Sequence, residues 1–521
     1  MIDGALGDIA RQRRANPYAA VGAALAGCFL ASYHTRFFGI GLPDLRGGFG
    51  LSVDEASWLS TVANAPQILT APAVPWLVMV FGIRPILMWP GLAYALLVTL
   101  IPFTTDLAQL FALHAVTALL LGLFVPATLL VIVRNLSPAL WLPAFALYAF
   151  RLAFTLNTGP WMTGYLVQTW GWRWLYWVDV PIALLMVGLA WYGSMPQRPN
   201  LDMLARADWG GMLLFGLSLT LVYVGLDQGN RLDWHNSGTI AAMLGGGAAL
   251  MACFVVHEAT TPAPWANPKI LARRNTILGL ATGVVFSFVT VSNSLLVPSF
   301  MIGIGQLRPE QFGWFLVVWV ALPLGVTIWL GVLLLRRFDF RFVMIAGFAS
   351  FAAGSLWATH LTNEWRMVDF IPIAAFQAVG LGITFTAVMI GNFTSVKPEV
   401  ASAFAAYIQI LRLVAVEFGI AVMSTFLRIR EQTHSNLIGL HVARGDADIA
   451  QAIAARAAMF QADGVAYAKA RATARLAAIV QREANVLAYI DGFSLTFVVA
   501  LFGIIVAAAM LPAPKGPLTS G

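Results

Sequence analysis

Long apolar segments recur along almost the entire chain, and short stretches that contain charge, proline or glycine separate them. Each segment has roughly the 20 residues that a helix needs to cross the hydrocarbon core of a bilayer. A chain of this length therefore has room for about fourteen membrane-spanning helices. The predicted helices cover residues 17–42, 54–80, 85–104, 107–133, 141–167, 174–194, 209–227, 237–257, 276–303, 309–335, 341–361, 367–393, 401–427 and 490–511.

The composition of the chain also indicates a lipid environment. Of its 521 residues, 59% are hydrophobic and 11% are charged, and the mean hydropathy is +0.78. Soluble domains carry about 25% charged residues, so we expect an all-α integral membrane protein with lipids around it. The net charge of +7 does not indicate nucleic-acid binding, because a basic excess in a membrane protein normally reflects its cytoplasmic loops.

Basic residues are distributed unevenly between the two sets of alternating loops. Since short loops rich in Lys and Arg stay in the cytoplasm, the richer side is predicted to be cytoplasmic, with both termini on it. A bacterial inner membrane is what the family resemblance described below implies. The poorer side holds Arg46, Arg173, Arg231, Arg308 and Arg366. The richer side holds Arg11, Arg13, Arg14, Arg84, Arg134, Arg198, Arg206, Lys269, Arg273, Arg274, Arg336, Arg337, Arg341, Lys397 and Lys515.

The clearest motifs lie in the fifth and sixth predicted helices, where GPWMTGY is followed by WRWLYWVDVPIA. Gly159 and Gly164 of the first motif lack side-chain bulk where two helices must approach closely. Pro160 between them frees a backbone carbonyl, which suits a helix that pivots. The two motifs resemble the GPxxGG and WRWxFxxNVPxG sequences of the major facilitator superfamily, in its 14-helix drug:proton antiporter branch of the EmrB/QacA type.

This resemblance extends over nearly the whole chain through looser matches, among them ADWGGMLL near Asp208 and LDQGNRLDW near Asp227. It implies two six-helix bundles that rock about a central cavity, while proton entry drives a small molecule outward. The implied division is a cytoplasmic N-terminus (1–16), a first bundle (17–194), a linker with two extra helices (195–275), a second bundle (276–511) and a cytoplasmic tail (512–521).

Departures from the family pattern concern its charged residues. The first helix resembles LDxTxxNVAxP but reads YHTRFFGIGLP, so His34 stands at the family's Asp and Arg36 at its Thr. In the fourth helix, the family's basic residue falls on His114, while Gly122 of the same motif is retained. The loop after the second helix keeps Arg84 but lacks the family's acidic residue. We therefore expect a gating charge network that differs from the usual one.

Proton coupling requires a side chain that changes its charge during transport. The candidates inside predicted spans are His34, His114 and Glu417, the histidines because their ordinary pKa lies nearest neutrality. The alternative for each is a polar contact that holds helices together. Asp179 is expected at the outer interface of the sixth helix, in a structural role.

Other polar residues at membrane depth are candidates for substrate contact, because a charge there is costly and normally faces the bundle interior. They are Arg36, Arg151, Arg412, Asn64 and Gln67, of which the last two, with Pro66 between them, are expected to break the second helix. Their alternative role is helix–helix packing. Arginines in the cavity without a first-helix carboxylate predict an anionic or neutral amphipathic substrate.

Residues 428–489 form the longest predicted segment outside the membrane. Two Ala-rich stretches there, with Arg, Lys and Gln interleaved, predict two amphipathic helices broken near Asp463 and Gly464. The segment is either a solvated loop or a docking element. The resemblance implies the second, in a tripartite pump with a periplasmic membrane-fusion adaptor and an outer-membrane channel.

Enzymatic functions have no support in the sequence. It contains no GxxxxGK[ST] phosphate loop, no HExxH pair, no metal-ligand cluster and no nucleophile elbow. We therefore expect neither a metal nor a cofactor, and only protons and a small molecule as ligands. Efflux is favoured by the resemblance, while proton-coupled uptake and a stand-alone exporter without an adaptor remain as alternatives.

Overall fold

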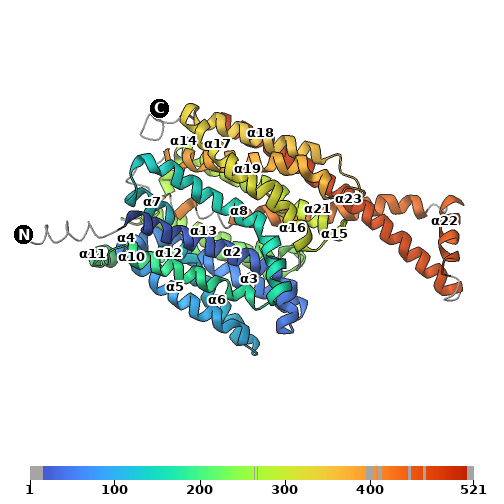
Figure 1. Cartoon of the computed structure of the whole chain (residues 1–521), viewed down its shortest axis with the longest axis horizontal. Coiled ribbons are helices and arrows are strands. Elements are labelled where there is room, and N and C mark those ends of the chain that lie inside the picture. The colour runs from blue at the N-terminus through green and yellow to red at the C-terminus, as the bar shows by residue number, and fades with distance from the viewer. Residues whose placement is uncertain are drawn as a thin grey trace, which may run out of the picture.

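The computed structural model describes residues 16–262, 264–266, 268–394, 404, 406–408, 414–443, 447–460 and 465–512. Every regular element in these residues is a helix, and most of the helices run side by side in one bundle (Figure 1). The prediction of an all-helical membrane fold is confirmed.

Between residues 16 and 194, all of which are described, the helices follow the six predicted spans. Several spans consist of two consecutive helices. The elements are α2 (Pro17–Phe49), α3 (Val53–Thr70), α4 (Val74–Phe81), α5 (Ile83–Leu100), α6 (Leu107–Phe124), α7 (Thr128–Asn135), α8 (Pro138–Trp170), α9 (Trp174–Trp177) and α10 (Asp179–Gly193).

The second span is not broken where the sequence predicted. Helix α3 continues through Pro66 and ends at Thr70, where a 3₁₀ turn, Ala71–Ala73, leads into α4. The break falls where Pro72 and Pro75 each lack a backbone N–H, so two hydrogen bonds of an α-helix cannot form there. The prediction of a break at Asn64 to Gln67 was therefore wrong.

The rest of the chain contributes the inserted pair and the second group of helices. Two of the later spans contain a π-helical turn, Ser292–Leu296 and Val317–Ala321. The elements are α11 (Leu201–Ala205), α12 (Trp209–Gly229), α13 (Gly238–Thr260), α14 (Arg274–Val289), α15 (Val297–Gly303), α16 (Pro309–Leu316), α17 (Leu322–Arg337), α18 (Phe340–Ala358), α19 (Ile371–Thr394), α21 (Ala415–Ala443), α22 (Ala447–Ala458) and α23 (Val465–Ala508).

Within the described residues, 11 helical segments are long and apolar enough to cross a membrane. The predicted spans at 17–42, 54–80 and 401–427 are not among them, but their described parts are helical. The structure thus fits about fourteen spans without establishing that count.

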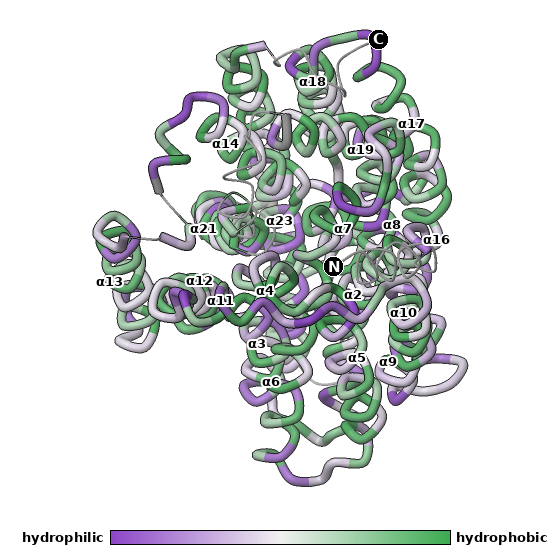
Figure 2. The backbone as a smooth tube through the Cα atoms, turned by 90° about the vertical axis from the view of Figure 1, so that its left-hand side faces the viewer, coloured by the Kyte–Doolittle hydropathy of each residue, from purple (hydrophilic) through white to green (hydrophobic). Residues whose placement is uncertain are grey.

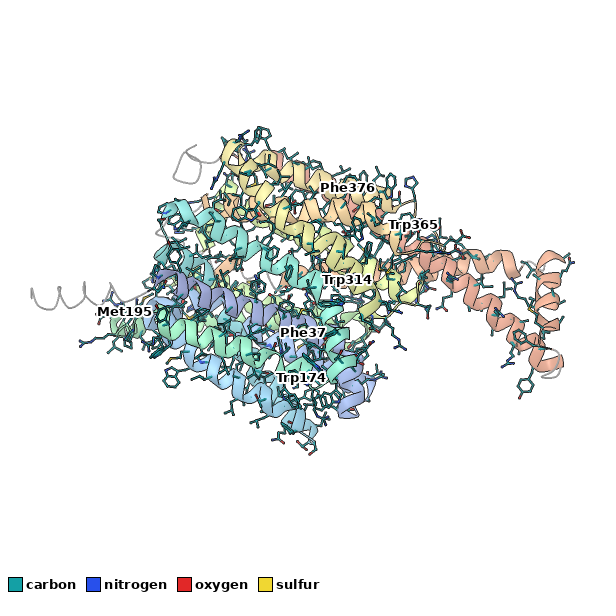
Figure 3. The ribbon with its side chains drawn as sticks, in the orientation of Figure 1. Phe37, Trp174, Met195, Trp314, Trp365 and Phe376 are labelled. Carbon is teal, nitrogen blue, oxygen red and sulfur yellow. The ribbon has the colours of Figure 1, made fainter. Side chains whose placement is uncertain are left out.

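Apolar side chains cover the outside of the bundle as well as its interior (Figure 3). Trp191 is 61% exposed, Trp314 54% and Val326 72%. Apolar surface on this scale would be costly in water and is stable against lipid tails. The chain is therefore a multi-pass membrane protein.

The inserted helix α12 lies between the two groups of helices. A cluster of buried side chains joins it to α3, α4 and α13, and α12 also contacts α21. Gly216 allows the close approach, because a Cβ atom there would lie 2.6 Å from the Leu69 carbonyl oxygen. Seen along the helices, α13 lies at the edge of the bundle, beyond α12 (Figure 2). Helix α12 is therefore the inserted helix that reaches the interior.

Helices α21, α22 and α23 form an extension at one end of the bundle, opposite the end where α2 begins and α23 ends (Figure 1). Both stretches predicted as amphipathic helices are helical. The sequence did not reveal that α21 continues to Ala443, or that α23 runs unbroken from Val465 to Ala508. The predicted break at Asp463 and Gly464 lies outside the described residues. We call this end of the bundle the hairpin end.

Candidate transport site

A cavity of about 220 Å³ lies in the middle of the bundle. Helices α2, α3 and α8 line it from the first group of helices, and α14, α19 and α21 line it from the second. Helix α12 contributes Tyr223 to the same wall. A central cavity between two groups of helices is the arrangement that alternating access requires.

Most of the residues predicted to contact substrate come together in this cavity. Its lining includes Arg36, Arg151, Asn64 and Gln67, and also Glu417, which the sequence singled out for proton coupling. Arg412 lies outside the described residues. Charged and polar groups that are far apart in the sequence therefore face one space.

Arg151 of α8 is 2% exposed and points into this polar region. It donates a hydrogen bond from Nη1 to Ser32 Oγ at 2.6 Å, and its guanidinium lies 4.7 Å from the centre of the Tyr148 ring. None of the ion pairs between described residues includes Arg151. Its charge is thus balanced by dipoles and an aromatic face, which leaves it able to attract an anion.

Arg36 lies on α2, one turn beyond Ser32, and interacts electrostatically with Glu417 of α21 and Tyr223 of α12. Gly159 of α8 makes room for it, because a Cβ atom at Gly159 would lie 3.1 Å from Arg36 Cβ. A glycine of the sequence motif therefore allows α8 to pack directly against the arginine.

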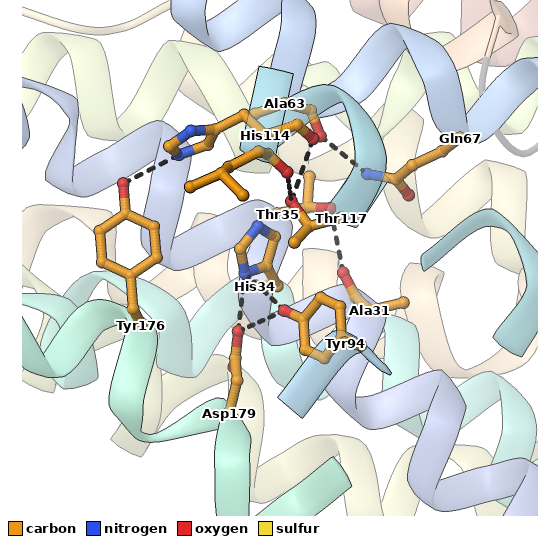
Figure 4. Close-up of polar contacts among 11 residues, drawn as sticks. Ala31, His34, Thr35, Ala63, Gln67, Tyr94, His114, Thr117, Tyr176 and Asp179 are labelled. Carbon is orange, nitrogen blue, oxygen red and sulfur yellow. Dashed lines mark hydrogen bonds and ion pairs between the residues drawn. The ribbon is translucent and has the colours of Figure 1, made fainter. Parts of the chain in front are cut away.

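Asn64 and Gln67 direct their amide groups to α3 itself. Asn64 Nδ2 donates to the Ser60 carbonyl at 2.9 Å. Gln67 Nε2 donates to the Ala63 carbonyl at 3.3 Å (Figure 4). Gly122 of α6 packs beside Gln67, since a Cβ atom there would lie 2.5 Å from the Gln67 carbonyl oxygen. Both amide residues line the cavity, and among the described residues neither amide oxygen accepts a hydrogen bond.

His34 does not face the cavity but forms a buried cluster with α5 and α10 (Figure 4). Its Nδ1 lies 2.6 Å from Asp179 Oδ2, and the Tyr94 hydroxyl donates to the same oxygen at 2.7 Å. His34 is 2% exposed and Asp179 0%. Among the described residues, His34 Nε2 and Asp179 Oδ1 have no hydrogen-bond partner. The cluster therefore holds a buried histidine–carboxylate pair with unused hydrogen-bonding capacity.

Asp179 lies at the start of α10, near the predicted end of the sixth span, but its side chain is buried in the protein and not exposed at an interface. Helix α10 begins at Asp179 itself and packs against α2, which turns the carboxylate inward to His34. The available signal was the motif, since Asp179 stands where WRWxFxxNVPxG has Asn. Tyr94, in an apolar run, gave no such signal.

His114 is also buried, with both ring nitrogens occupied. Nδ1 lies 2.8 Å from the Leu110 carbonyl oxygen and Nε2 lies 3.0 Å from the Tyr176 hydroxyl. A carbonyl only accepts, so Nδ1 carries the hydrogen and Nε2 accepts from Tyr176. This arrangement satisfies the neutral imidazole.

The glycine motif of α8 lies at the contact between the two groups of helices. A Cβ atom at Gly164 would lie 2.5 Å from Glu310 Cβ of α16, and Gln168 donates a hydrogen bond to Glu310. Deeper in the bundle, Asn293 donates to Asn157 Oδ1 at 2.8 Å. Pro160 lies between these contacts, within the α8 helix. Arg84 lies elsewhere, 5.7 Å from the Trp191 ring centre.

A helical bundle that encloses a polar cavity between two groups of membrane-spanning helices defines a membrane transporter. Residues 24–419 match the model of the Major Facilitator Superfamily, and the chain belongs to that family.

Several curated relatives of the chain are named for multidrug export or for resistance. The fatty acid resistance protein FarB of Neisseria gonorrhoeae is 21% identical over 80% of this chain and 81% of its own length. The multidrug export protein EmrB of Escherichia coli K12 is 22% identical over 78% of this chain and 79% of its own. The resemblance to the EmrB-type branch is thereby confirmed.

Solved structures agree on the fold. A structure reported for substrate recognition in proton dependent oligopeptide transporters matches this chain with a TM-score of 0.56 at 13% sequence identity. The match covers 94% of this chain and 98% of the other chain. The proton:xylose symporter XylE has a TM-score of 0.54 at 11% identity, covering 93% and 94%. At these identities the likeness concerns architecture alone.

Proposed function

We propose that the chain exports amphipathic small molecules, anionic or neutral, across the inner membrane in exchange for protons. The observation that carries this proposal is the charge of the central cavity. Among the described lining residues, Arg36 and Arg151 are cationic and Glu417 is the one carboxylate. A cavity with this balance attracts anions and repels lipophilic cations.

The relatives support export and the same substrate class. They include multidrug exporters and a protein named for resistance to fatty acids, which are amphipathic carboxylates. We infer that an acidic head group binds near Arg151, while apolar cavity residues such as Phe286 and Leu381 contact the tail.

Proton coupling in this proposal uses Glu417 in the cavity and the His34–Asp179 pair beside it. Helix α2 carries both His34 and Arg36, so proton binding to the pair and substrate binding to the cavity act on one helix. Neutralising Asp179 weakens the attraction that holds α10 to α2. Coupling arises if the protonated and the substrate-bound states favour opposite conformations.

Transport by purified protein in liposomes tests the cavity's charge preference. An alkylsulfonate and an alkyltrimethylammonium of equal chain length differ mainly in the sign of the head group. We expect a pH gradient that is acidic on the side to which substrate moves to drive only the sulfonate, because protons then leave that side in exchange. Preferential transport of the ammonium compound would refute the proposal.

We further propose that the extension formed by α21, α22 and α23 docks a periplasmic adaptor and, through it, an outer-membrane channel. Its exposed apolar side chains, Leu440, Met459 and Tyr467, support this role. The orientation is that predicted from the basic loops, with both termini in the cytoplasm.

Deleting residues 440–480 tests this role of the extension. We expect the shortened protein to transport normally in liposomes but to confer no resistance in cells. Unchanged resistance would indicate a stand-alone exporter.

A further inference from the structure

The LDQGNRLDW motif forms the end of α12 and the turn after it, at the hairpin end of the bundle. Asp227 of this motif faces α3. Thr61 donates a hydrogen bond to Asp227 Oδ2, and Gln228 Nε2 donates to the same oxygen at 3.1 Å. The inserted helix thus places a carboxylate inside the bundle, next to the second span.

A chain of hydrogen bonds connects Asp227 to the surface. Gln228 Nε2 donates to Thr61 Oγ1 at 2.5 Å, and Arg231 Nε donates to Gln228 Oε1 at 2.6 Å. Arg231 also pairs with Asp54, whose side chain is 79% exposed. Asp227 is itself partly exposed, and these hydrogen bonds connect it to the exposed Asp54.

Asp227 also interacts with the cavity on its other side. Tyr223 lies one helical turn before Asp227 on the same face of α12 and lines the cavity with Glu417. Glu417 and Arg36 line the same cavity as Tyr223, so the carboxylate of Glu417 lies on the cavity side of Asp227. Since two nearby carboxylates repel when both are ionised, a proton on one favours the charged form of the other.

We propose that Asp227 carries protons between the hairpin end of the bundle and Glu417. The inference rests on the proton coupling proposed above. In each transfer, Asp227, whose side chain is partly exposed, takes one proton from water at the hairpin end and becomes neutral, while Thr61 and Gln228 hold its carboxyl group in place. The proton then passes to ionised Glu417 across the part of the cavity that Tyr223 and Glu417 line, and Asp227 becomes ionised again.

The charged groups around the route suit this transfer. Arg231 lies at the outer end, and Arg36 lies at the inner end beside Glu417. A guanidinium keeps its proton, so neither arginine relays one. Each instead stabilises the carboxylate nearest to it when that carboxylate is ionised. In this proposal, the inserted pair of helices, α12 and α13, takes part in transport through Asp227 of α12.

Asp227→Asn tests the inference, because asparagine still accepts the bond from Thr61 and cannot carry a proton. In liposomes we measure transport of a labelled alkylsulfonate driven by a pH gradient, and its exchange across the membrane without a gradient. We expect the driven rate to fall by about 100-fold and exchange to stay within about twofold of wild type. Thr61→Val, which removes the hydroxyl, should slow the driven rate by roughly tenfold.

Asp233→Asn is the matched control, since Asp233 belongs to the same motif but is exposed at the surface and pairs with Arg428 at 3.5 Å. It should transport as wild type does. A wild-type driven rate in both Asp227→Asn and Thr61→Val would overturn the inference, as would an equal loss of driven transport and exchange. If the wild-type protein itself shows no gradient-driven transport, the proposed function fails first and the inference with it.

Discussion

The His34–Asp179 pair gives the sharpest prediction about the balance of charge in the bundle. Asp179 Oδ2 accepts hydrogen bonds from His34 at 2.6 Å and from Tyr94 at 2.7 Å. A bond to a charged group contributes about 1.5–3 kcal/mol, against about 0.5–1.5 kcal/mol for a neutral one. The isosteric Asp179→Asn change should therefore destabilise the protein by about 2–3 kcal/mol.

Thermal unfolding in detergent measures this cost through a double-mutant cycle of Asp179→Asn and His34→Gln. Because the two side chains touch, we expect a coupling of about 1 kcal/mol or more. Asp202→Asn is the control, since Asp202 is exposed on α11 and should change stability by less than about 0.5 kcal/mol.

Transport separates a coupling role of the pair from a structural one. Asp179→Asn should lose most gradient-driven transport and its pH dependence, while substrate exchange without a gradient continues. If the loss of stability in the double variant equals the sum of the losses in the two single variants, the energetic interaction between the side chains is refuted. A wild-type pH profile in a stable Asp179→Asn protein would refute the role in coupling.

Three further changes test the rest of the site. Arg151→Gln should weaken binding of an alkylsulfonate by roughly 30-fold, because about 2 kcal/mol from a charged hydrogen bond is lost. Binding of a neutral amphiphile should barely change. Equilibrium binding in detergent measures both affinities. Gly122→Leu should cost about 1–3 kcal/mol by overpacking against Gln67, whereas Gly188→Ala, with no atom within 4 Å of the added Cβ, should cost little by thermal unfolding. His114→Gln should leave the pH profile of transport unchanged, and a shifted profile would contradict the neutral tautomer.

The membrane-spanning part of the fold was largely predictable because a bilayer dictates its pattern. Lipid offers no hydrogen bonds to the backbone, so each crossing must be a helix of sufficient apolar length. The path of the extension was not predictable in the same way. Helix α21 continues from the membrane into the extension with no glycine or proline between Gly419 and Gly439, and α23 continues without a break through Gly492, so hydropathy alone could not show where a helix ends.

The candidate site residues were easiest to find from the sequence where a charge interrupts an apolar run. Arg36, Arg151 and Glu417 are conspicuous for this reason, and the fold brings all three to one cavity. Asp179 was expected only in a structural role and Asp227 was noted only within a motif, because each lies near a helix end, where a carboxylate is ordinary. Their partners are far away in the sequence, since Asp179 is 145 positions from His34 and Asp227 is 166 positions from Thr61. Such contacts depend on packing that a single sequence does not reveal.

The first helix lacks the family's carboxylate, and in the structure α10 supplies a carboxylate instead, as Asp179. The first helix supplies His34, which lies opposite that carboxylate. A second carboxylate at the cavity wall, in addition to Glu417, would balance the charge of both arginines and favour cations. Because Asp179 is buried against His34 instead, the described cavity lining keeps two arginines, Arg36 and Arg151, against one carboxylate. In the proposed coupling, a carboxylate on α10 in place of the first helix separates the proton-binding pair from the substrate-binding arginines. Helix α2 can then take part in binding both a proton, through His34, and an anion, through Arg36.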